Sequence, residues 1–250
     1  MGQSPRRLVG QFGRVPERAP ADAPPGVAHP VESLVSGLSR SHRHGRRMPR
    51  SPSPPLFLPD ILEEIWKSLV DGAAHARDAF HAPTVGTTRD GIAQLRTVVL
   101  RFVDRDAGEL GFHTDARSLK RTDLTASPHL AWHFYDRKRK IQLRILGHAS
   151  THTDDEVADR AWHGVTPLGR RCYGQLLGPG QSTEQPDVPL PHLGDLQTGD
   201  PQTIAECRQN FCVVRCHLTE IDWLHLRFEG HQRARFTREG SEWSGCWIAP

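Results

Sequence analysis

Hydrophobic residues after Pro59 recur at intervals of three and four positions, which is the spacing of a helix that is apolar along one face. They are Ile61, Leu62, Ile65, Trp66, Leu69 and Val70. Asp60 stands directly before them as a suitable N-cap. We therefore predict an amphipathic helix that begins after Pro59 and ends near Phe80.

The period falls to two residues after Pro83, which is typical of strands that are buried on one side. Predicted strands cover residues 84–88, 94–103, 109–114, 129–135, 140–151, 211–218, 221–227 and 231–238. The segment 104–108 has the composition of a turn. We therefore expect the two strands that flank it to form a hairpin.

Short helices are predicted between these strands. One covers residues 118–126, a second begins at the capping box of Thr153 and Glu156, and a third begins at Pro167. The stretch from Gly178 to Asp200 is rich in proline and glycine, so we predict a long loop there. Strands without a regular strand-helix-strand alternation indicate an α+β fold that is mainly β, a mostly antiparallel barrel with attached helices.

Charge divides the 250-residue chain into two parts. The formal net charge is +3, but residues 1–55 hold nine arginines and three acidic residues, a charge of +6. Residues 56–250 then carry 23 basic and 26 acidic residues, a charge of −3. The first part also holds ten of the twenty prolines and only one aromatic residue, too little apolar area to offset the entropy of ordering. We predict a disordered leader over 1–55 and a folded domain over 56–250, with translation from either Met1 or Met48.

Several classes of protein do not fit this sequence. No apolar run approaches the roughly 18 residues of a membrane-spanning helix, so we expect no membrane partner. Five cysteines, an odd number, favour a reduced, cytoplasmic protein over a disulfide framework. The leader lacks a motif that reads bases, so its charge supports only nonspecific, salt-sensitive contact with nucleic acid. Common hydrolase, nucleotidase and dinucleotide-binding motifs are absent from the sequence.

Two histidine pairs have the four-residue spacing that would suit a metal on a helix: His129 with His133, and His148 with His152. Both pairs fall on predicted strands, where four residues span about 13 Å. Neither pair can then share one ion. We predict no metal site.

A combination of cations and a hydroxyl suggests a phosphate site. Arg96 lies on a predicted strand, and Ser118 and Lys120 stand where a later strand enters a helix. Charge-assisted donors at a helix N-terminus form a suitable cradle for phosphate. The alternative is a set of surface charges on a half-exposed sheet. Gln142, a polar residue within a strand, either contacts a ligand or faces solvent.

Several segments together resemble the pyridoxamine 5'-phosphate oxidase superfamily of FMN-binding split-barrel flavoproteins. They are RTVVLR (96–101), FHTDARSLK (112–120), IQLRILGHA (141–149), GQS (180–182), HQRARF (231–236) and the terminal WIAP. The resemblance covers residues 56–250 and is closest to the FMN-binding-domain branch rather than to the authentic vitamin B6 oxidases. It implies a split β-barrel, FMN as the cofactor, a small-molecule substrate and a homodimer with FMN at the interface.

The resemblance also implies cofactor contacts. These would come from Arg96, Thr97, Val98, Val99, Leu100, His113, Thr114, Ser118, Lys120, Gln142, Gln181, Ser182 and Arg235. Arg96 and Lys120 would bind the FMN phosphate, with Ser118 nearby, in agreement with the cradle described above. The backbone of residues 97–100 would run along the isoalloxazine ring.

The positions that would contact the substrate depart from the family pattern. The places of the substrate-phosphate ligands are taken by Arg101, Trp162, Thr166 and Arg170, and the candidate catalytic residues are His231 and Arg233. Leu119 also stands where the family often has an arginine. We therefore expect an FMN-dependent oxidoreductase whose substrate is unknown and is not predicted to be pyridoxamine phosphate. A non-catalytic flavin-binding or sensor protein is the alternative.

Overall fold

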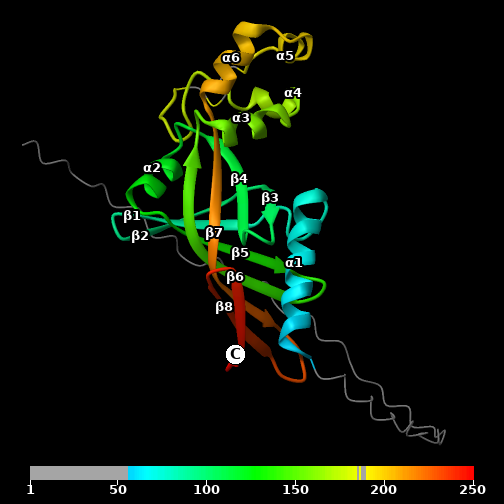
Figure 1. The fold of residues 1–250 in the computed structure, drawn as a ribbon. Coiled ribbons are helices and arrows are strands. Elements are labelled where there is room, and N and C mark those ends of the chain that lie inside the picture. Colours follow the sequence, from blue (N-terminus) through cyan, green and yellow to red (C-terminus); the bar gives the residue numbers. More distant parts are fainter. Residues whose placement is uncertain (1–55, 185, 187–189) are drawn as a thin grey trace, which may run out of the picture. The chain divides into compact units, whose positions relative to one another are not determined.

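Helix α1, Leu58–Ala74, is the first element of a computed structural model that describes residues 56–184, 186 and 190–250 (Figure 1). Its buried hydrophobic residues, Ile61, Ile65, Trp66 and Leu69, all belong to the predicted apolar face. The helix ends before Phe80 because the chain turns back onto it. The ring of His81 bonds to the carbonyl oxygen of Gly72 at 2.8 Å, and Phe80 packs so closely on Gly72 that a Cβ there would lie 2.8 Å from that of Phe80. The predicted leader and the two candidate start sites lie outside the described residues.

The described residues include nine strands in one antiparallel sheet; the antiparallel pairing was predicted, but one strand was not. They are β1 (Thr84–Arg89), β2 (Ile92–Thr97), β3 (Leu100–Asp104), β4 (Glu109–Asp115), β5 (His129–Asp136), β6 (Ile141–His152), β7 (Phe211–His225), β8 (Gln232–Glu239) and β9 (Glu242–Ile248). Their order is β2-β1-β5-β6-β7-β4-β3, with β8 also paired to β7 and β9 paired to β8. The predicted hairpin on either side of residues 104–108 is that of β3 and β4.

Two strand predictions were wrong in extent. Residues 94–103 form two strands because the backbone N–H groups of Val98 and Leu100 donate to the carbonyl oxygens of Pro83 and His81, both at 2.9 Å. Strand β2 then pairs with β1, whereas β3 pairs with β4. Conversely, the two strands predicted in 211–227 are the single strand β7, because β6 pairs with it on both sides of a register shift. Strand β9 was not predicted.

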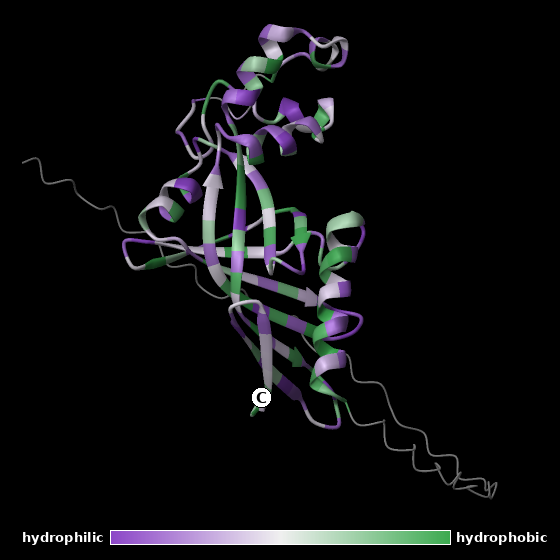
Figure 2. Cartoon of the chain, in the orientation of Figure 1, coloured by the Kyte–Doolittle hydropathy of each residue, from purple (hydrophilic) through white to green (hydrophobic). Residues whose placement is uncertain are grey.

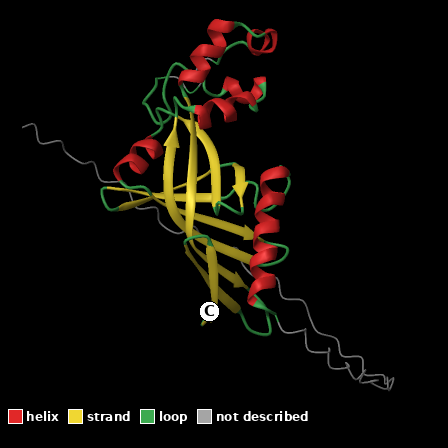
Figure 3. Cartoon of the chain, in the orientation of Figure 1, coloured by secondary structure: helices red, strands yellow, loops and turns green. Residues whose placement is uncertain are grey.

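The remaining helices are α2 (Leu119–Ala126), α3 (Glu156–His163), α4 (Pro167–Arg171), α5 (Leu193–Thr198) and α6 (Pro201–Gln209) (Figure 3). Asp155, not Thr153, caps α3, because its carboxylate accepts a hydrogen bond from the N–H of Ala158 at 3.0 Å. Helix α5 lies within the stretch that was predicted to be a loop. None of the described helices is long and apolar enough to cross a membrane.

Two groups of buried residues hold these elements together. The larger group joins α1 to the sheet and includes Trp66, Phe80, Phe112, Trp132 and Phe134. Figure 2 shows the alternation of hydrophobic and hydrophilic residues along the strands that supply it. The smaller group lies among α3, α5, α6 and the start of β7, and consists of Ala158, Trp162, Leu196, Cys207, Phe211 and Val213. Helices α3, α5 and α6 therefore share a small core with the start of β7 at one end of the sheet.

A buried carboxylate joins three neighbouring strands on the other face of the sheet. The side chain of Asp222 is only 6% exposed, and it accepts hydrogen bonds from Arg144 at 2.5 Å and from Arg233 at 2.7 and 3.0 Å. Burial raises the pKa of Asp222, but the two arginines outweigh it, so the pKa lies below its usual value. The ion pairs link β6, β7 and β8.

The register shift in β6 requires glycine at position 147. A Cβ there would lie 2.7 Å from Sγ of Cys216 and closer still to the carbonyl oxygen of His217. We expect Gly147→Ala to lower the free energy of unfolding by about 1–3 kcal/mol, as for other overpacked sites. Urea denaturation would measure this. Gly194→Ala is the control, because a Cβ there meets nothing within 4 Å, and equal stability of the two variants would contradict the prediction.

The ion pairs of Asp222 should make the fold sensitive to acid. The pKa is lower in the folded protein than the value of about 3.9 in an unfolded chain, so this stabilisation is present above pH 4 and is lost as the pH falls through the folded-state pKa. Asp222→Asn should lower the free energy of unfolding by about 3 kcal/mol at pH 7, because two arginines lose their partner. Between pH 5 and pH 3 the stability of this variant should fall less than that of the wild type.

Chemical denaturation at several pH values would test that expectation. Glu156→Gln is the control, since Glu156 forms an ion pair with Arg160 in which both side chains are largely exposed and should change stability by less than about 1 kcal/mol. An unchanged pH slope in Asp222→Asn would show that this carboxylate does not contribute to acid unfolding.

Candidate functional site

Four residues that the sequence singled out lie together beside the N-terminus of α2. The Lys120 ammonium donates to the Thr114 hydroxyl at 2.8 Å, and that hydroxyl lies 3.2 Å from the hydroxyl of Ser118. Ser118 is the N-cap residue of α2, but its side chain makes no capping hydrogen bond. The pKa of Lys120 is lowered first by burial and then by the charge of Arg96. We call Arg96, Thr114, Ser118 and Lys120 the cradle.

Two side chains that were not predicted, Thr87 and Asp123, hold Arg96, and a third, Arg89, holds Asp123. Arg96 donates to the hydroxyl of Thr87 at 2.7 Å and, more weakly, to the carboxylate of Asp123 at 3.4 Å. Arg89 also donates to Asp123, at 2.7 and 3.1 Å. Asp123 could have been suspected from the sequence, because it stands three positions after Lys120 and so shares a face of the helix with it.

The segment 97–100 connects β2 to β3 next to the cradle. The N–H groups of Val98 and Leu100 are already donated to backbone carbonyls, as described above, and both side chains are buried. These two N–H groups and these two side chains are therefore not available to a flavin.

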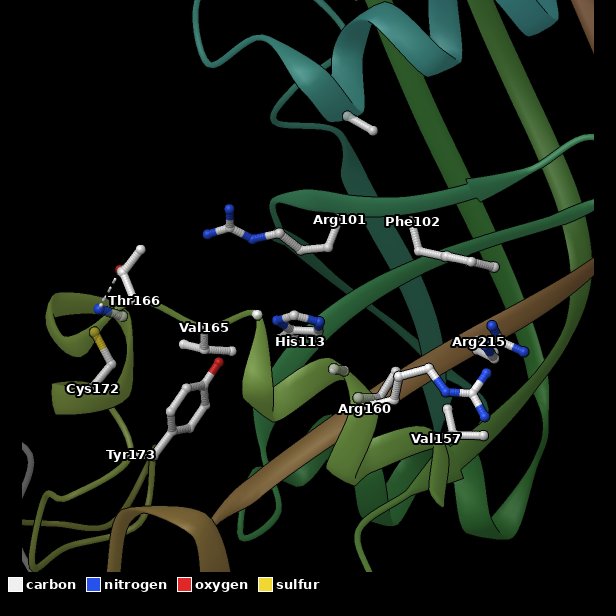
Figure 4. A pocket seen from close by; sticks show the side chains of 15 residues that line it. Arg101, Phe102, His113, Val157, Arg160, Val165, Thr166, Cys172, Tyr173 and Arg215 are labelled. Atoms are coloured by element: carbon white, nitrogen blue, oxygen red, sulfur yellow. Dashed lines mark hydrogen bonds between the residues drawn. The ribbon is translucent and has the colours of Figure 1, made fainter. Parts of the chain in front are cut away.

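A pocket of about 670 Å³ lies between the sheet and helices α3 and α4 (Figure 4). Figure 4 shows Arg101, His113, Thr166 and Tyr173 around the same hollow. Burial, and then the charge of Arg101, lowers the pKa of His113 to about 4, while burial raises the pKa of Tyr173. At neutral pH both side chains are therefore uncharged.

Three arginines line this pocket, Arg101, Arg160 and Arg215, and Arg160 pairs with the exposed Glu156 at 3.5 Å. Arg101 differs from the other two. Among the described residues, no carboxylate forms an ion pair with it. Arg215, in contrast, pairs with Glu109 at 3.4 Å and stacks on Phe102 at 4.3 Å. The pocket thus combines one unpaired guanidinium with neutral polar groups, and Tyr173 is a lining residue that the sequence analysis missed.

Two of the predicted substrate residues contact each other instead of lining this pocket. Trp162 is 6% exposed and packs in the smaller core. The guanidinium of Arg170 stacks on its ring at 4.9 Å and donates to its carbonyl oxygen at 3.3 Å. Thr166 does line the pocket, and its hydroxyl accepts a hydrogen bond from the N–H of Gly169.

Three other predicted cofactor or catalytic residues, Gln142, Arg233 and Arg235, lie on the opposite face of the sheet from Arg96. Arg96 occupies a row of paired positions that runs through buried Trp132, Ile145, Ile221 and Phe236. Neighbouring residues of a strand point to opposite faces. Gln142, three positions before Ile145, and Arg235, directly before Phe236, therefore face the other side.

That outer face also holds Arg233, whose guanidinium is bound to Asp222. Arg235 lies 3.7 Å from a carboxylate oxygen of Glu220, and His231 is exposed just before β8. In the loop after α4, the side chain of Gln181 accepts a hydrogen bond from the N–H of Gly178, and Ser182 is exposed. The implied flavin ligands therefore fall into separate groups, two of which lie on opposite faces of the sheet.

The described residues include no group of three or more histidine, cysteine or acidic side chains that could hold a metal ion. The ring of His129 faces that of His148 on the next strand, with a centroid distance of 4.9 Å. The histidines that approach each other are therefore neighbours across the sheet rather than the pairs spaced four apart in the sequence.

Part of the chain matches a known protein family. Residues 63–153 match the family of the pyridoxamine 5'-phosphate oxidase FMN-binding domain. A search of curated proteins finds no match. The matched segment contains β1 to β6 and α2, and so includes the whole cradle.

Two solved structures share the fold. One is a pyridoxamine 5'-phosphate oxidase-related FMN-binding protein from Nostoc punctiforme, which is 22% identical, with a TM-score of 0.59 over 80% of this chain and 100% of that one. The other is PhzG from Burkholderia lata in complex with tetrahydrophenazine-1-carboxylic acid, 21% identical, with a TM-score of 0.56 over 79% of this chain and 95% of that one. The predicted split-barrel fold and the predicted resemblance to the pyridoxamine 5'-phosphate oxidase FMN-binding domain are both confirmed.

Proposed function

We propose that this protein binds FMN with its phosphate in the cradle. The observation that carries the proposal is the partly buried ammonium of Lys120, which has a hydroxyl partner but, among the described residues, no carboxylate in an ion pair. A cation held away from water calls for an anion. Arg96 supplies a second cation, and Thr114 and Ser118 supply hydroxyl groups, so the residues present fit a phosphate group.

We further propose that the protein acts as a homodimer with FMN between the two copies. The separation of the implied ligands supports this, because Arg96 and Lys120 cannot easily share one flavin with Gln142 and Arg235 across the sheet of a single chain. A second copy could present its Gln142 and Arg235 to the cradle of the first. All five cysteines are free thiols, which also supports the predicted cytoplasmic setting.

The proposed activity is an FMN-dependent oxidation or reduction of a small anionic molecule. Bound FMN would supply the hydride chemistry. The protein would contribute the pocket beside His113, where Arg101 would bind the anionic group of the substrate and His113 and Tyr173 would hydrogen-bond to its ring. The similar fold of PhzG holds a ring compound with a carboxylate, which is the ligand chemistry that these residues favour.

The flavin part of the proposal predicts a coloured protein. Full-length protein mixed with FMN should keep a flavin absorption band after gel filtration. Arg96→Ala and Lys120→Ala should each weaken FMN binding roughly 10- to 100-fold, the usual effect of losing one hydrogen bond to a charged group. Flavin fluorescence titration would measure the affinity.

Arg105→Ala is the matched control for those variants. Arg105 pairs with Glu63 on the surface, and both side chains are about half exposed, so FMN affinity should stay the same. A wild-type protein that binds no FMN would refute the proposal. If both Arg96→Ala and Lys120→Ala keep the FMN affinity of the wild type, the phosphate must bind outside the cradle.

The pocket predicts a preference for anions. With FMN bound, phenazine-1-carboxylate should perturb the flavin spectrum at lower concentration than uncharged phenazine. Arg101→Gln should weaken binding of the carboxylate roughly tenfold, because a charge-assisted hydrogen bond is lost, and should leave phenazine unchanged. Equal effects on both probes would argue against Arg101 as the anion ligand.

The redox step needs its own test. Under anaerobic conditions, tetrahydrophenazine-1-carboxylate, anionic amines and reduced nicotinamides would be added in turn to the FMN-loaded protein. Bleaching of the flavin band by any of them supports an oxidoreductase. No bleaching by any donor at saturation would overturn the redox proposal and favour a flavin-binding protein without catalysis.

A further inference from the structure

Asp123 is the most completely hydrogen-bonded acid next to the cradle. It lies on α2, its side chain is 1% exposed, and four donor groups from three residues reach it. Two of those groups belong to Arg89, which is held by both carboxylate oxygens. Burial raises the pKa of Asp123, but hydrogen bonds from Arg89 and Thr87 lower it below its usual value. The side chain is therefore an anion at neutral pH.

This carboxylate holds Arg96 in two ways. One is the direct contact of 3.4 Å. The other runs through Thr87, whose hydroxyl donates to Asp123 at 2.8 Å and accepts from Arg96 at 2.7 Å. The carbonyl oxygen of Gln94 accepts a further hydrogen bond from Arg96 at 2.8 Å. The guanidinium is thus fixed on the side of β1 and β2, next to α2, before any ligand arrives.

The charges around Asp123 add up to a value with chemical meaning. Arg89, Arg96 and Lys120 contribute three positive charges and Asp123 contributes one negative charge, which leaves +2; Asp115, the other carboxylate near Lys120, is already paired with Arg117. A phosphate monoester carries about −1.5 to −2 at pH 7. Without Asp123, Arg89 and Arg96 would lose the carboxylate with which they form ion pairs. Without Arg89, that carboxylate would compete with the phosphate for Arg96.

We propose that Asp123 and Arg89 form a counter-charge pair that positions Arg96 and matches the cradle to a phosphate dianion. The inference rests on the proposed FMN binding and adds two residues to it. Asp123 is a positioning residue, because its own charge keeps it away from the phosphate. Arg89 balances Asp123, so that Arg96 is held but remains available.

A purely structural role makes a different prediction. If the ion pairs only held α2 against the hairpin of β1 and β2, their loss would lower the stability of the fold and would weaken the binding of all flavins equally. Positioning for phosphate acts on FMN and not on riboflavin, which has the same ring system without the phosphate. The ratio of the two affinities therefore separates the roles.

The experiment titrates FMN and riboflavin into full-length, flavin-free protein and follows flavin fluorescence. Wild type should bind FMN more tightly than riboflavin. Asp123→Asn should lower the affinity for FMN about tenfold or more, since the lost interactions are to a charged group. It should change the affinity for riboflavin by less than about twofold. Arg89→Gln should shift the ratio in the same direction, Arg89→Lys should restore most of it by keeping the charge, and Arg105→Gln should have no effect.

Each outcome decides between the possibilities. Unchanged or tighter FMN binding in both Asp123→Asn and Arg89→Gln overturns the inference, and so does an equal loss of both flavins. If Asp123→Asn does not fold, Arg89→Gln carries the test, because a third of the Arg89 side chain is exposed. A wild-type protein that binds neither flavin overturns the proposed function itself. Equal affinity of the wild type for both flavins would show that the cradle does not bind the phosphate.

Discussion

The backbone pairing of strand β7 is the constraint on which the other elements depend. Its fifteen residues span about 50 Å, and it pairs with β6 along most of its length. On its other edge it pairs first with β4 and then with β8. The cradle and the pocket belong to the β4 half, through Thr114 and His113, whereas Arg233 and Arg235 belong to the β8 half. One continuous strand thus fixes both groups of candidate residues, and Gly147 lets β6 follow it closely through the register shift.

Periodicity along the sequence predicted the elements whose stability is local or whose burial is regular. Strands β5 and β6 fall within a few residues of their predicted bounds for that reason, and helix α1 begins where predicted but ends six residues before Phe80. The errors arise where distant backbone groups decide. Residues 98–100 break the expected long strand because Pro83 and His81 accept their hydrogen bonds, and helix α5 forms where proline and glycine indicated only a loop. No pattern within either segment contains that information.

The candidate site divides in the same way. Ser118 and Lys120 stand two residues apart at a strand-to-helix junction, so their proximity to each other could be read from the sequence. The contribution of Asp123 and Arg89 could not, because it depends on how α2 packs against β1. Trp162 and Arg170 illustrate the opposite error: a family resemblance suggests that they face a ligand, but a cation–π contact and burial in the smaller core turn them toward each other. The net charge of −3 for residues 56–250 also did not predict that Arg89, Arg96 and Lys120 gather near the carboxylate of Asp123.

The neutral state of His113 has a consequence for the chemistry that the pocket can tolerate. An uncharged imidazole has one N–H donor and one acceptor nitrogen, and it exchanges them by changing tautomer. The hydroxyl of Tyr173 has the same dual capacity. A ligand that loses a hydride and a proton alters its own donors and acceptors, and these two side chains can adapt to both of its forms without gaining or losing charge. In the proposed redox activity, the wall of the pocket would therefore hold a compound and its oxidised product with similar strength, and the fixed charge of Arg101 would recognise the part of the molecule that does not change.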